Sequence, residues 1–182
     1  MSEQPTYAPV EALEALVAQR VRFVVIGGFA SQLRGSPSLT GDTDVCYARD
    51  RVNLERLARA LRDLKASLRG APEDVLFKLD SKTLEAGDHF TFDTTAGALD
   101  VLGHPSGIPG GYEELERAAD QLEIAPGLAV QVASVDDIIR MKRAAGRPKD
   151  LIEVEVLGAL RDEIDEQALA EHRRRRSRRS GA

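Results

Sequence analysis

The chain has 182 residues, of which 42% are hydrophobic and 30% charged, as in an ordinary globular protein that can bury a sizeable core. Only 4% are aromatic and none is Trp, which argues against the base-stacking surfaces of proteins that bind single-stranded nucleic acids. The single cysteine, Cys46, excludes an internal disulfide and a cysteine metal cluster. With no apolar run long enough to span a membrane, we expect a cytoplasmic protein that makes no membrane contact.

The net charge of −5 is unevenly distributed. Residues 173–182 hold six arginines and no acid, which leaves 25 − 6 = 19 basic against 30 acidic residues, or −11, on the rest of the chain. Such an acidic body binds nucleic-acid phosphates poorly. We expect residues 166–182 to be a basic, disordered tail, which is either a solvated charge run or a segment that attracts RNA.

The first half of the chain shows alternating helix and strand patterns. These patterns predict a helix over Val10–Gln19, a strand over Val21–Ile26, a helical turn over Phe29–Arg34, a strand over Thr43–Tyr47 and a leucine-rich helix over Val52–Leu68.

The second half groups strands before helices. It predicts strands over Val75–Leu79, His89–Asp93 and Ala98–Leu102, a helix over Tyr112–Ala119, a hairpin of Gln121–Ile124 with Val130–Val132, a helix from a Ser134 cap to Ala145, and a last helix over Lys149–Ile164.

This order predicts an α+β fold with a mixed β-sheet, helices packed against it and a C-terminal helical pair. We expect one domain over residues 1–165, with a core over about 20–133 and a helical appendage over about 134–165.

Two carboxylates stand on the second strand. Asp42 and Asp44 are two residues apart and therefore share one face of a strand. Adjacent carboxylates repel unless a cation lies between them, and Mg²⁺ is bound by such carboxylates together with substrate phosphates. The alternative is a polar turn after Gly41 with both acids in solvent.

A third carboxylate, Asp100, lies inside the apolar run Ala98–Leu102. A carboxylate buried there is costly unless it is paired or binds a metal. If its strand lies beside that of Asp42, three carboxylates converge, as a two-metal phosphoryl transfer requires. Asp93 is a rival third acid, and an edge-strand position facing water is the alternative for Asp100.

The glycine pair Gly27-Gly28 lies between a strand and a helical turn. There the backbone can approach phosphate closely, and helix N–H groups point towards it. The alternative is a tight turn that binds nothing. Ser31 either adds a hydroxyl to the phosphates or caps the turn.

The junction between the last two helices is rich in cations, of which Lys142 and Lys149 are our candidates for offsetting triphosphate charge. Cations at a helix end are also favoured by the helix dipole alone. Asp150 either holds one of these lysines or caps the last helix.

The run Val25–Ala30, followed by Thr40-x-Asp42-x-Asp44, resembles the nucleotidyltransferase fold of the DNA polymerase β superfamily. The later Lys142…Gly146-Arg147-x-Lys149-Asp150 resembles the AbiEii-type branch, which includes toxins of type IV toxin–antitoxin systems. The chain departs from that pattern at Ser38 and Glu153, where many relatives have Arg and Asp.

The resemblance implies a nucleotidyltransferase core in which Asp42, Asp44 and Asp100 bind two Mg²⁺ ions, with Mn²⁺ as a substitute. It implies transfer of a nucleoside monophosphate from an NTP to an acceptor, such as a tRNA 3′ end, another RNA, a protein or an antibiotic. It also implies an antitoxin partner. The rival hypothesis is a catalytically silent module of the same fold that binds RNA or a toxin–antitoxin partner.

Overall fold

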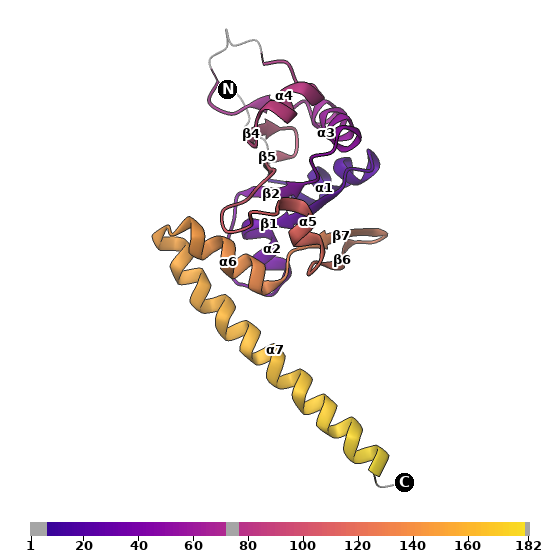
Figure 1. Cartoon of the computed structure of the whole chain (residues 1–182), viewed down its shortest axis with the longest axis vertical. Coiled ribbons are helices and arrows are strands. Elements are labelled where there is room, and N and C mark those ends of the chain that lie inside the picture. Colours follow the sequence, from indigo (N-terminus) through magenta and orange to yellow (C-terminus); the bar gives the residue numbers. More distant parts are fainter. Residues whose placement is uncertain (1–6, 72–76, 181–182) are drawn as a thin grey trace.

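The computed structural model describes residues 7–71 and 77–180, with side chains up to residue 171. Its strands form one seven-stranded sheet in the order β3-β4-β5-β2-β1-β7-β6 (Figure 1). The strands are β1 (Phe23–Ile26), β2 (Asp42–Tyr47), β3 (Ser67–Leu68), β4 (His89–Thr94), β5 (Gly97–Leu102), β6 (Asp120–Ala125) and β7 (Leu128–Val132). The central strand β2 runs parallel to β5 and antiparallel to β1, so the sheet is mixed and the predicted α+β class is confirmed.

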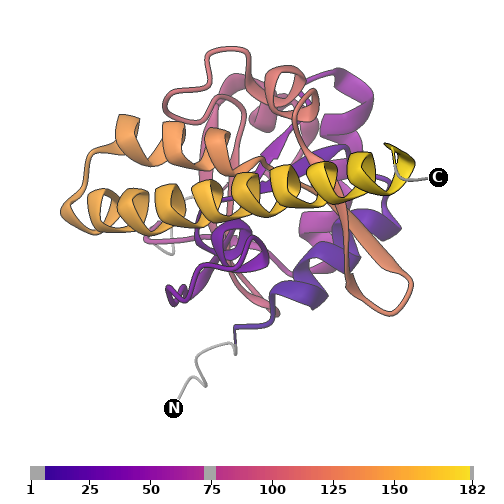
Figure 2. The same ribbon diagram turned by 90° about the horizontal axis from the view of Figure 1, so that it is seen from below.

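The helices form two groups. They are α1 (Pro9–Ala18), α2 (Gly27–Leu33), α3 (Arg51–Asp63), α4 (Ser81–Ala86), α5 (Gly111–Glu116), α6 (Val135–Ala145) and α7 (Pro148–Ser180). In one group α3 contacts both α1 and α4, and in the other α6 contacts both α2 and α7, whereas α5 belongs to neither group and contacts β1 and β2. Figure 2 shows α6 alongside the first part of α7, which is the C-terminal helical pair that the sequence predicted.

Strands β2 and β5 have one apolar and one polar face over the site. On β5, Leu99 and Val101 are fully buried in the core, while Asp100 between them is only partly buried. On β2, Thr43 and Val45 are likewise buried, and the aspartates that alternate with them are partly exposed. This alternation turns the acids of both strands away from the core, as their period of two requires.

One helix and one strand predicted before residue 80 differ from the structure. The helix expected over Val52–Leu68 ends at Asp63, because the backbone turns left-handed at Lys65 (φ 51°) and Leu68 then pairs with Phe92 in the sheet. Strand pairing thus overrides the leucine spacing.

Part of the strand expected over Val75–Leu79, residues 75–76, lies outside the described residues, and residues 77–79 form no strand. Phe77 instead packs its ring against Phe90 and Phe92 of β4. Helix α4, which was not predicted, follows at once and is capped by Asp80, whose carboxylate accepts a hydrogen bond from the Thr83 N–H.

The last two helices are joined by a tight turn. Helix α6 begins at the predicted cap, where the Ser134 hydroxyl accepts a hydrogen bond from the Asp137 N–H, and ends at Gly146 with φ 65°. Helix α7 begins at Pro148 and continues past Ile164 to Ser180, into the segment over 166–182 that we expected to be disordered. No glycine or proline interrupts it between Gly158 and Gly181, which explains its length. None of the helices in the described part of the chain has both the length and the apolarity needed to cross a bilayer.

Candidate active site

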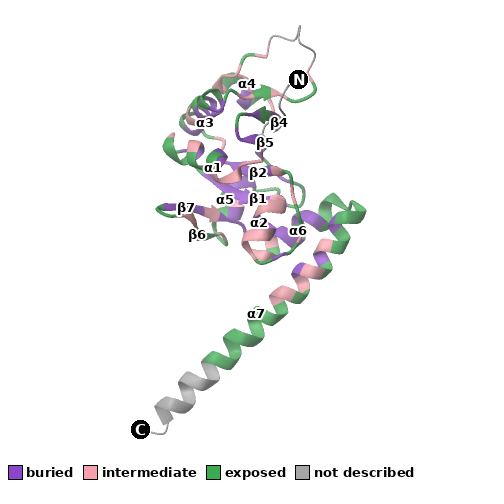
Figure 3. Ribbon diagram, turned by 180° about the vertical axis from the view of Figure 1, so that it is seen from behind, coloured by how far each residue is buried: buried purple, intermediate pink, exposed green. Residues whose placement is uncertain are grey.

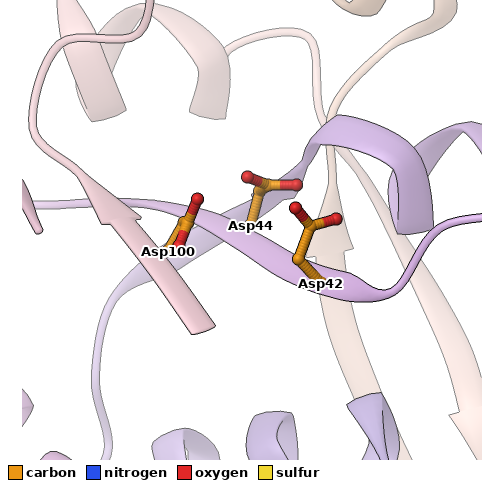
Figure 4. A group of neighbouring side chains, drawn as sticks. All are labelled: Asp42, Asp44 and Asp100. Atoms are coloured by element: carbon orange, nitrogen blue, oxygen red, sulfur yellow. The ribbon is translucent and has the colours of Figure 1, made fainter. Parts of the chain in front are cut away.

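Three carboxylates meet on the polar face of the sheet. Asp44 of β2 lies directly opposite Asp100 of β5 in the parallel register, and Asp42 is two residues before Asp44. One oxygen from each of the three lies within 4.8 Å of the others. Figure 4 shows the three side chains projecting to the same side of the two strands. The predicted convergence is confirmed, and the three oxygens could contact one metal ion.

The alternatives for the third acid are not supported. Asp93 is exposed, and its Oδ1 accepts a hydrogen bond from Arg69 Nε at 2.8 Å. Asp100 is not on an edge strand either, because β5 lies between β4 and β2.

The ionised cluster is electrostatically costly. Burial, and then the negative charges of Asp42 and Asp100, raise the pKa of Asp44 from 3.8 to about 7. The positive charge of Lys142 and the backbone N–H of Gly28 act in the opposite direction but do not cancel the rise. At neutral pH, Asp44 therefore has a strong tendency to hold a proton or to take a cation in its place.

The surroundings of Asp100 also disfavour its ionised form. Burial raises its pKa, and the charge of Asp42 adds to that effect, while Arg69 opposes it. Its Oδ1 atom is buried and has no hydrogen-bond partner. A buried carboxylate oxygen without a partner is costly, so this donor set fits a divalent cation, which would relieve both the missing contact and the repulsion.

The first turn of α2 lies directly on this cluster. Gly27 has φ 68°, and a Cβ at this position would lie 2.1 Å from Asp44 Oδ2. A Cβ at Gly28 would lie 2.6 Å from the side chain of Thr40. Thr40 Oγ1 in turn donates a hydrogen bond to Asp42 Oδ1 at 2.6 Å. Both glycines are therefore needed for the close approach of α2 to the acids, whatever they bind.

Ser31 does not reach the cluster. Its side chain is fully buried, and Oγ donates a hydrogen bond to the carbonyl of Gly27 at 3.1 Å. It is not among the residues that line the cavity over the carboxylates. The hydroxyl therefore secures the first turn of α2, which was the alternative interpretation of this residue.

The two candidate lysines line the same cavity but differ in environment. Lys142 of α6 is buried, and its Nζ lies 2.6 Å from Glu153 Oε2 and 3.9 Å from Asp150 Oδ1. Lys149, at the start of α7, is exposed. Lys142 is thus neutralised by α7, whereas Lys149 faces the solvent.

Asp150 contacts two cations. Arg147 Nε donates to its Oδ2 at 2.6 Å and Arg147 Nη2 to its Oδ1 at 3.1 Å, and Lys142 Nζ lies 3.9 Å from the same Oδ1. The Arg147 guanidinium lowers the pKa of Asp150, with burial acting in the opposite direction. Its Oδ2 also accepts a hydrogen bond from the Arg147 N–H at 3.3 Å, directly before α7, so Asp150 both contacts a candidate lysine and caps the last helix, the two roles that the sequence left open.

Several residues that line this cavity could not be assigned a role from the sequence. Glu153 follows Asp150 by three positions on α7, a spacing that places both on one helix face, but only the fold shows that Lys142 lies there. Thr40 stands in the acidic motif itself, and its contact with Asp42 could not be read from spacing. The loop residue Leu39 is 95% exposed at this cavity.

The cavity measures about 540 Å³, within the usual range for small-molecule sites. Its lining combines the three carboxylates, the cations of the α6–α7 junction and an apolar part made by Ile26, Leu39, Leu102, Pro105 and Met141. An anionic group held through metal ions, next to an apolar moiety, is the kind of ligand that matches this lining.

No protein-family model matches the sequence, and no curated protein is significantly similar to it. A Thermotoga maritima protein, TM1012, described as a candidate nucleotidyltransferase, is similar in structure, with 16% identity, 86% of this chain and 90% of that chain covered, and a TM-score of 0.47. The antibiotic-resistance factor ANT(2'')-Ia is also similar, with 14% identity, coverage of 90% and 97%, and a TM-score of 0.48. Because both scores are below 0.5, neither likeness assigns a family or an activity, and function must be inferred from the site.

Proposed function

We propose that this protein is a Mg²⁺-dependent nucleotidyltransferase, which moves a nucleoside monophosphate from an NTP to an acceptor hydroxyl. The observation that carries the proposal is the group of three carboxylate oxygens within 4.8 Å of one another under the glycine turn. The raised pKa of Asp44 and the unpartnered Oδ1 of Asp100 support a divalent cation rather than solvent as the partner of these acids.

In this proposal Asp42, Asp44 and Asp100 hold two Mg²⁺ ions, which Mn²⁺ can replace. When bound, the ions would neutralise triphosphate charge and would supply Lewis-acid activation of the phosphoryl group. The acceptor oxygen forms a bond to the α-phosphorus while the bond to the bridging oxygen breaks, so pyrophosphate leaves. The carboxylate of Asp100, which lines the cavity, takes the proton of the acceptor hydroxyl.

The cations on the opposite side of the cavity stabilise the leaving pyrophosphate. Lys149 is exposed and free to approach it, and Arg147, although paired with Asp150, lines the same wall. Lys142 is bound by Glu153 and would exchange this partner for phosphate oxygens. The backbone at Gly27 and Gly28 allows the β- and γ-phosphates to lie against α2. Ser31 supports this turn from inside the core.

The identity of the acceptor is a separate part of this proposal. We take it to be the 3′ end of tRNA or a related RNA, because residues 142–150 resemble the AbiEii-type pattern. The same resemblance makes a toxin with an antitoxin partner, acting in the cytoplasm, the biological role to test. We propose that the catalytic domain comprises residues 1–165, with a core over about 20–133, an appendage over about 134–165, and the basic segment beyond it.

The test is incubation of the purified protein with each α-³²P-labelled NTP, Mg²⁺ and total bacterial RNA, with RNA and protein resolved on one gel. Label in a tRNA-sized band is expected, and it should be lost in Asp44→Asn. The matched control is Asp93→Asn, since Asp93 is also an aspartate of the sheet but lies on β4, two strands from β2, and pairs with Arg69.

Label on protein would replace RNA with a protein side chain as acceptor. Label that persists in Asp44→Asn would overturn the catalytic mechanism. No label, together with no Mg²⁺-dependent NTP binding by calorimetry, would leave the non-catalytic binding module.

A further inference from the structure

The cavity over the carboxylates extends beyond them to β4. Because β5 lies between β2 and β4, Asp100 is the acid nearest β4. On β4, Thr91 lies opposite Asp100, and His89 lies opposite Leu102. Side chains two residues apart on a strand share a face, so His89 stands on the same face of the sheet as Asp100. It lines the cavity together with Leu102. His89 is therefore part of the site, on the side of Asp100 that is away from β2.

The imidazole of His89 is available to a ligand. The residue is exposed, and within the described part of the chain its ring makes no hydrogen bond or ion pair. In His104, by contrast, Nδ1 lies 2.7 Å from Asp88 Oδ1, which fixes the ring. Burial raises the pKa of Asp100, and the positive charges of Arg69 and His89 oppose this rise, so the His89 ring is close to that carboxyl. Figures 1 and 3 show α7 extending away from the end of the sheet that carries β4, so the described part of α7 does not cover β4.

The fixed cations of the cavity lie on the other side of the acids. The charge of Lys142 opposes the effect of burial on the pKa of Asp44. Hydrogen bonds to Asp150 raise the pKa of Arg147, and the charges of the two acids of β2 add to this effect. Lys142 and Arg147 are thus close to β2, whereas His89 is close to the acid of β5. The two sides of the acid cluster therefore differ, with fixed positive charges on one side and an imidazole on the other.

The proposed reaction needs a different group on each side of the acids. In phosphoryl transfer the attacking and leaving oxygens lie roughly in line with the phosphorus. With the pyrophosphate against the cations near β2, the acceptor oxygen approaches over β5 and β4, where Asp100 takes its proton. Arg69, the other cation on this side, pairs with Asp93 at 2.8 Å and does not line the cavity. The reacting end of the acceptor therefore meets the imidazole of His89 and the apolar side chain of Leu102.

We propose that His89 binds the hydroxyl next to the reacting one, so that the acceptor is a ribose end with both a 2′- and a 3′-hydroxyl. This inference rests on the proposed nucleotidyl transfer and adds to it the group that recognises the acceptor. The 3′-oxygen reacts beside Asp100, while the 2′-hydroxyl meets the imidazole, which can donate one hydrogen bond and accept another. Leu102, beside His89 in the sheet, gives the sugar ring an apolar surface. The 2′-hydroxyl distinguishes RNA from DNA, so His89 selects RNA ends.

The test compares two acceptors that differ in one hydroxyl. A short single-stranded RNA and the same RNA with a 2′-deoxy terminal nucleotide are each incubated with labelled NTP and Mg²⁺, and kcat/KM for the acceptor is measured. We expect the natural chain to prefer the ribose end by about tenfold, which is the effect of one lost hydrogen bond. His89→Ala should lower kcat/KM for the ribose end by a similar factor, hardly change that for the 2′-deoxy end, and leave KM for the NTP unchanged.

Two variants separate this contact from a general effect on the fold. His89→Gln keeps a hydrogen-bond donor and an acceptor and should recover part of the preference. His104→Ala removes the same kind of side chain outside the cavity lining and should keep the preference in full. An equal loss for both acceptors in His89→Ala, or a natural chain without a preference, would overturn the proposal.

A binding measurement distinguishes failure of this inference from failure of the proposed function. The ring signals of the histidines are followed by NMR with Mg²⁺ and an NTP analogue that has methylene between the α- and β-phosphorus, while adenosine or 2′-deoxyadenosine is added. The signal of His89 should shift with adenosine and hardly with 2′-deoxyadenosine, and that of His104 with neither. Equal label on both RNAs without this shift would keep the proposed function and overturn the ribose contact. The shift without any label would support the ribose contact and contradict catalysis, and the absence of both would contradict both.

Discussion

The Asp44→Asn substitution should stabilise the metal-free protein. In the folded state, burial and the neighbouring aspartates raise the pKa of Asp44 from 3.8 to about 7, so the fold opposes its ionisation. An unfolded chain ionises this group freely. Above the folded pKa the native state must therefore hold a charge that the unfolded state holds at little cost, and Asn removes that charge while nearly keeping the shape.

The magnitude follows from the shift. A rise from 3.8 to about 7 is roughly three units, each worth about 1.4 kcal/mol, which gives an upper limit of about 4 kcal/mol. We expect about half of this, ~2 kcal/mol, after local relaxation, and hence a gain of about 4–8 °C in Tm for a chain of this size.

The sign depends on pH. A carboxyl whose folded pKa is raised destabilises the fold progressively as pH increases from 3.8 to about 7, and the cost is constant above that range. The gain from Asp44→Asn should therefore be full at about pH 8 and nearly absent at about pH 4.

The assay is thermal unfolding of both proteins in EDTA, followed by addition of Mg²⁺. The ion should stabilise the natural chain at about pH 8 and have a much smaller effect on the variant. A variant that is less stable than the natural chain at high pH, or a gain that is the same at both pH values, would refute the electrostatic account of the cluster.

Three further predictions concern the stability and reactivity of single residues. Gly27→Ala should lower the free energy of unfolding by about 3 kcal/mol, because it combines a left-handed backbone with a Cβ 2.1 Å from a carboxylate oxygen. The control, Gly158→Ala on α7, has open space and should raise that free energy by up to about 1 kcal/mol, and urea unfolding compares the two variants. Lys142→Met leaves Glu153 without its partner at 2.6 Å and should lower the free energy of unfolding by about 3 kcal/mol. The double variant Lys142→Met/Glu153→Gln should recover most of this loss, and a double variant as unstable as the single one would contradict the ion pair. Burial raises the pKa of the Cys46 thiol to about 12, so iodoacetamide should modify it only on unfolding, and rapid labelling of the native protein at neutral pH would disprove this burial.

The carboxylate side of the site could be predicted from local patterns. Asp42 and Asp44 share a face because strands have a period of two, and Asp100 is marked by its apolar neighbours in the same way. What the sequence could not give is the pairing of β2 with β5, because it joins segments more than fifty residues apart. From the sequence, the three carboxylates are therefore expected to meet only if β2 and β5 are neighbours in the sheet.

The cationic side was less predictable for a related reason. Lys142 looks like a helix-end cation by spacing, and only packing of α7 against α6 shows that Glu153 neutralises it. The error in α3 has the same origin, since Leu68 continues the helical spacing but gains a strand partner in Phe92. Local periodicity thus fails where a distant segment offers a better contact.

The order of the site residues along the chain has a consequence during synthesis. All three carboxylates lie within the first 100 residues, while the lysines and the arginine that line the cavity come after residue 141. A chain that is still emerging from the ribosome therefore holds the acids before the cations that offset them exist. The complete cavity, with both its acids and its cations, therefore forms only when the start of α7 has left the exit tunnel, so the last helical pair to be translated sets the moment at which the proposed ligand can bind.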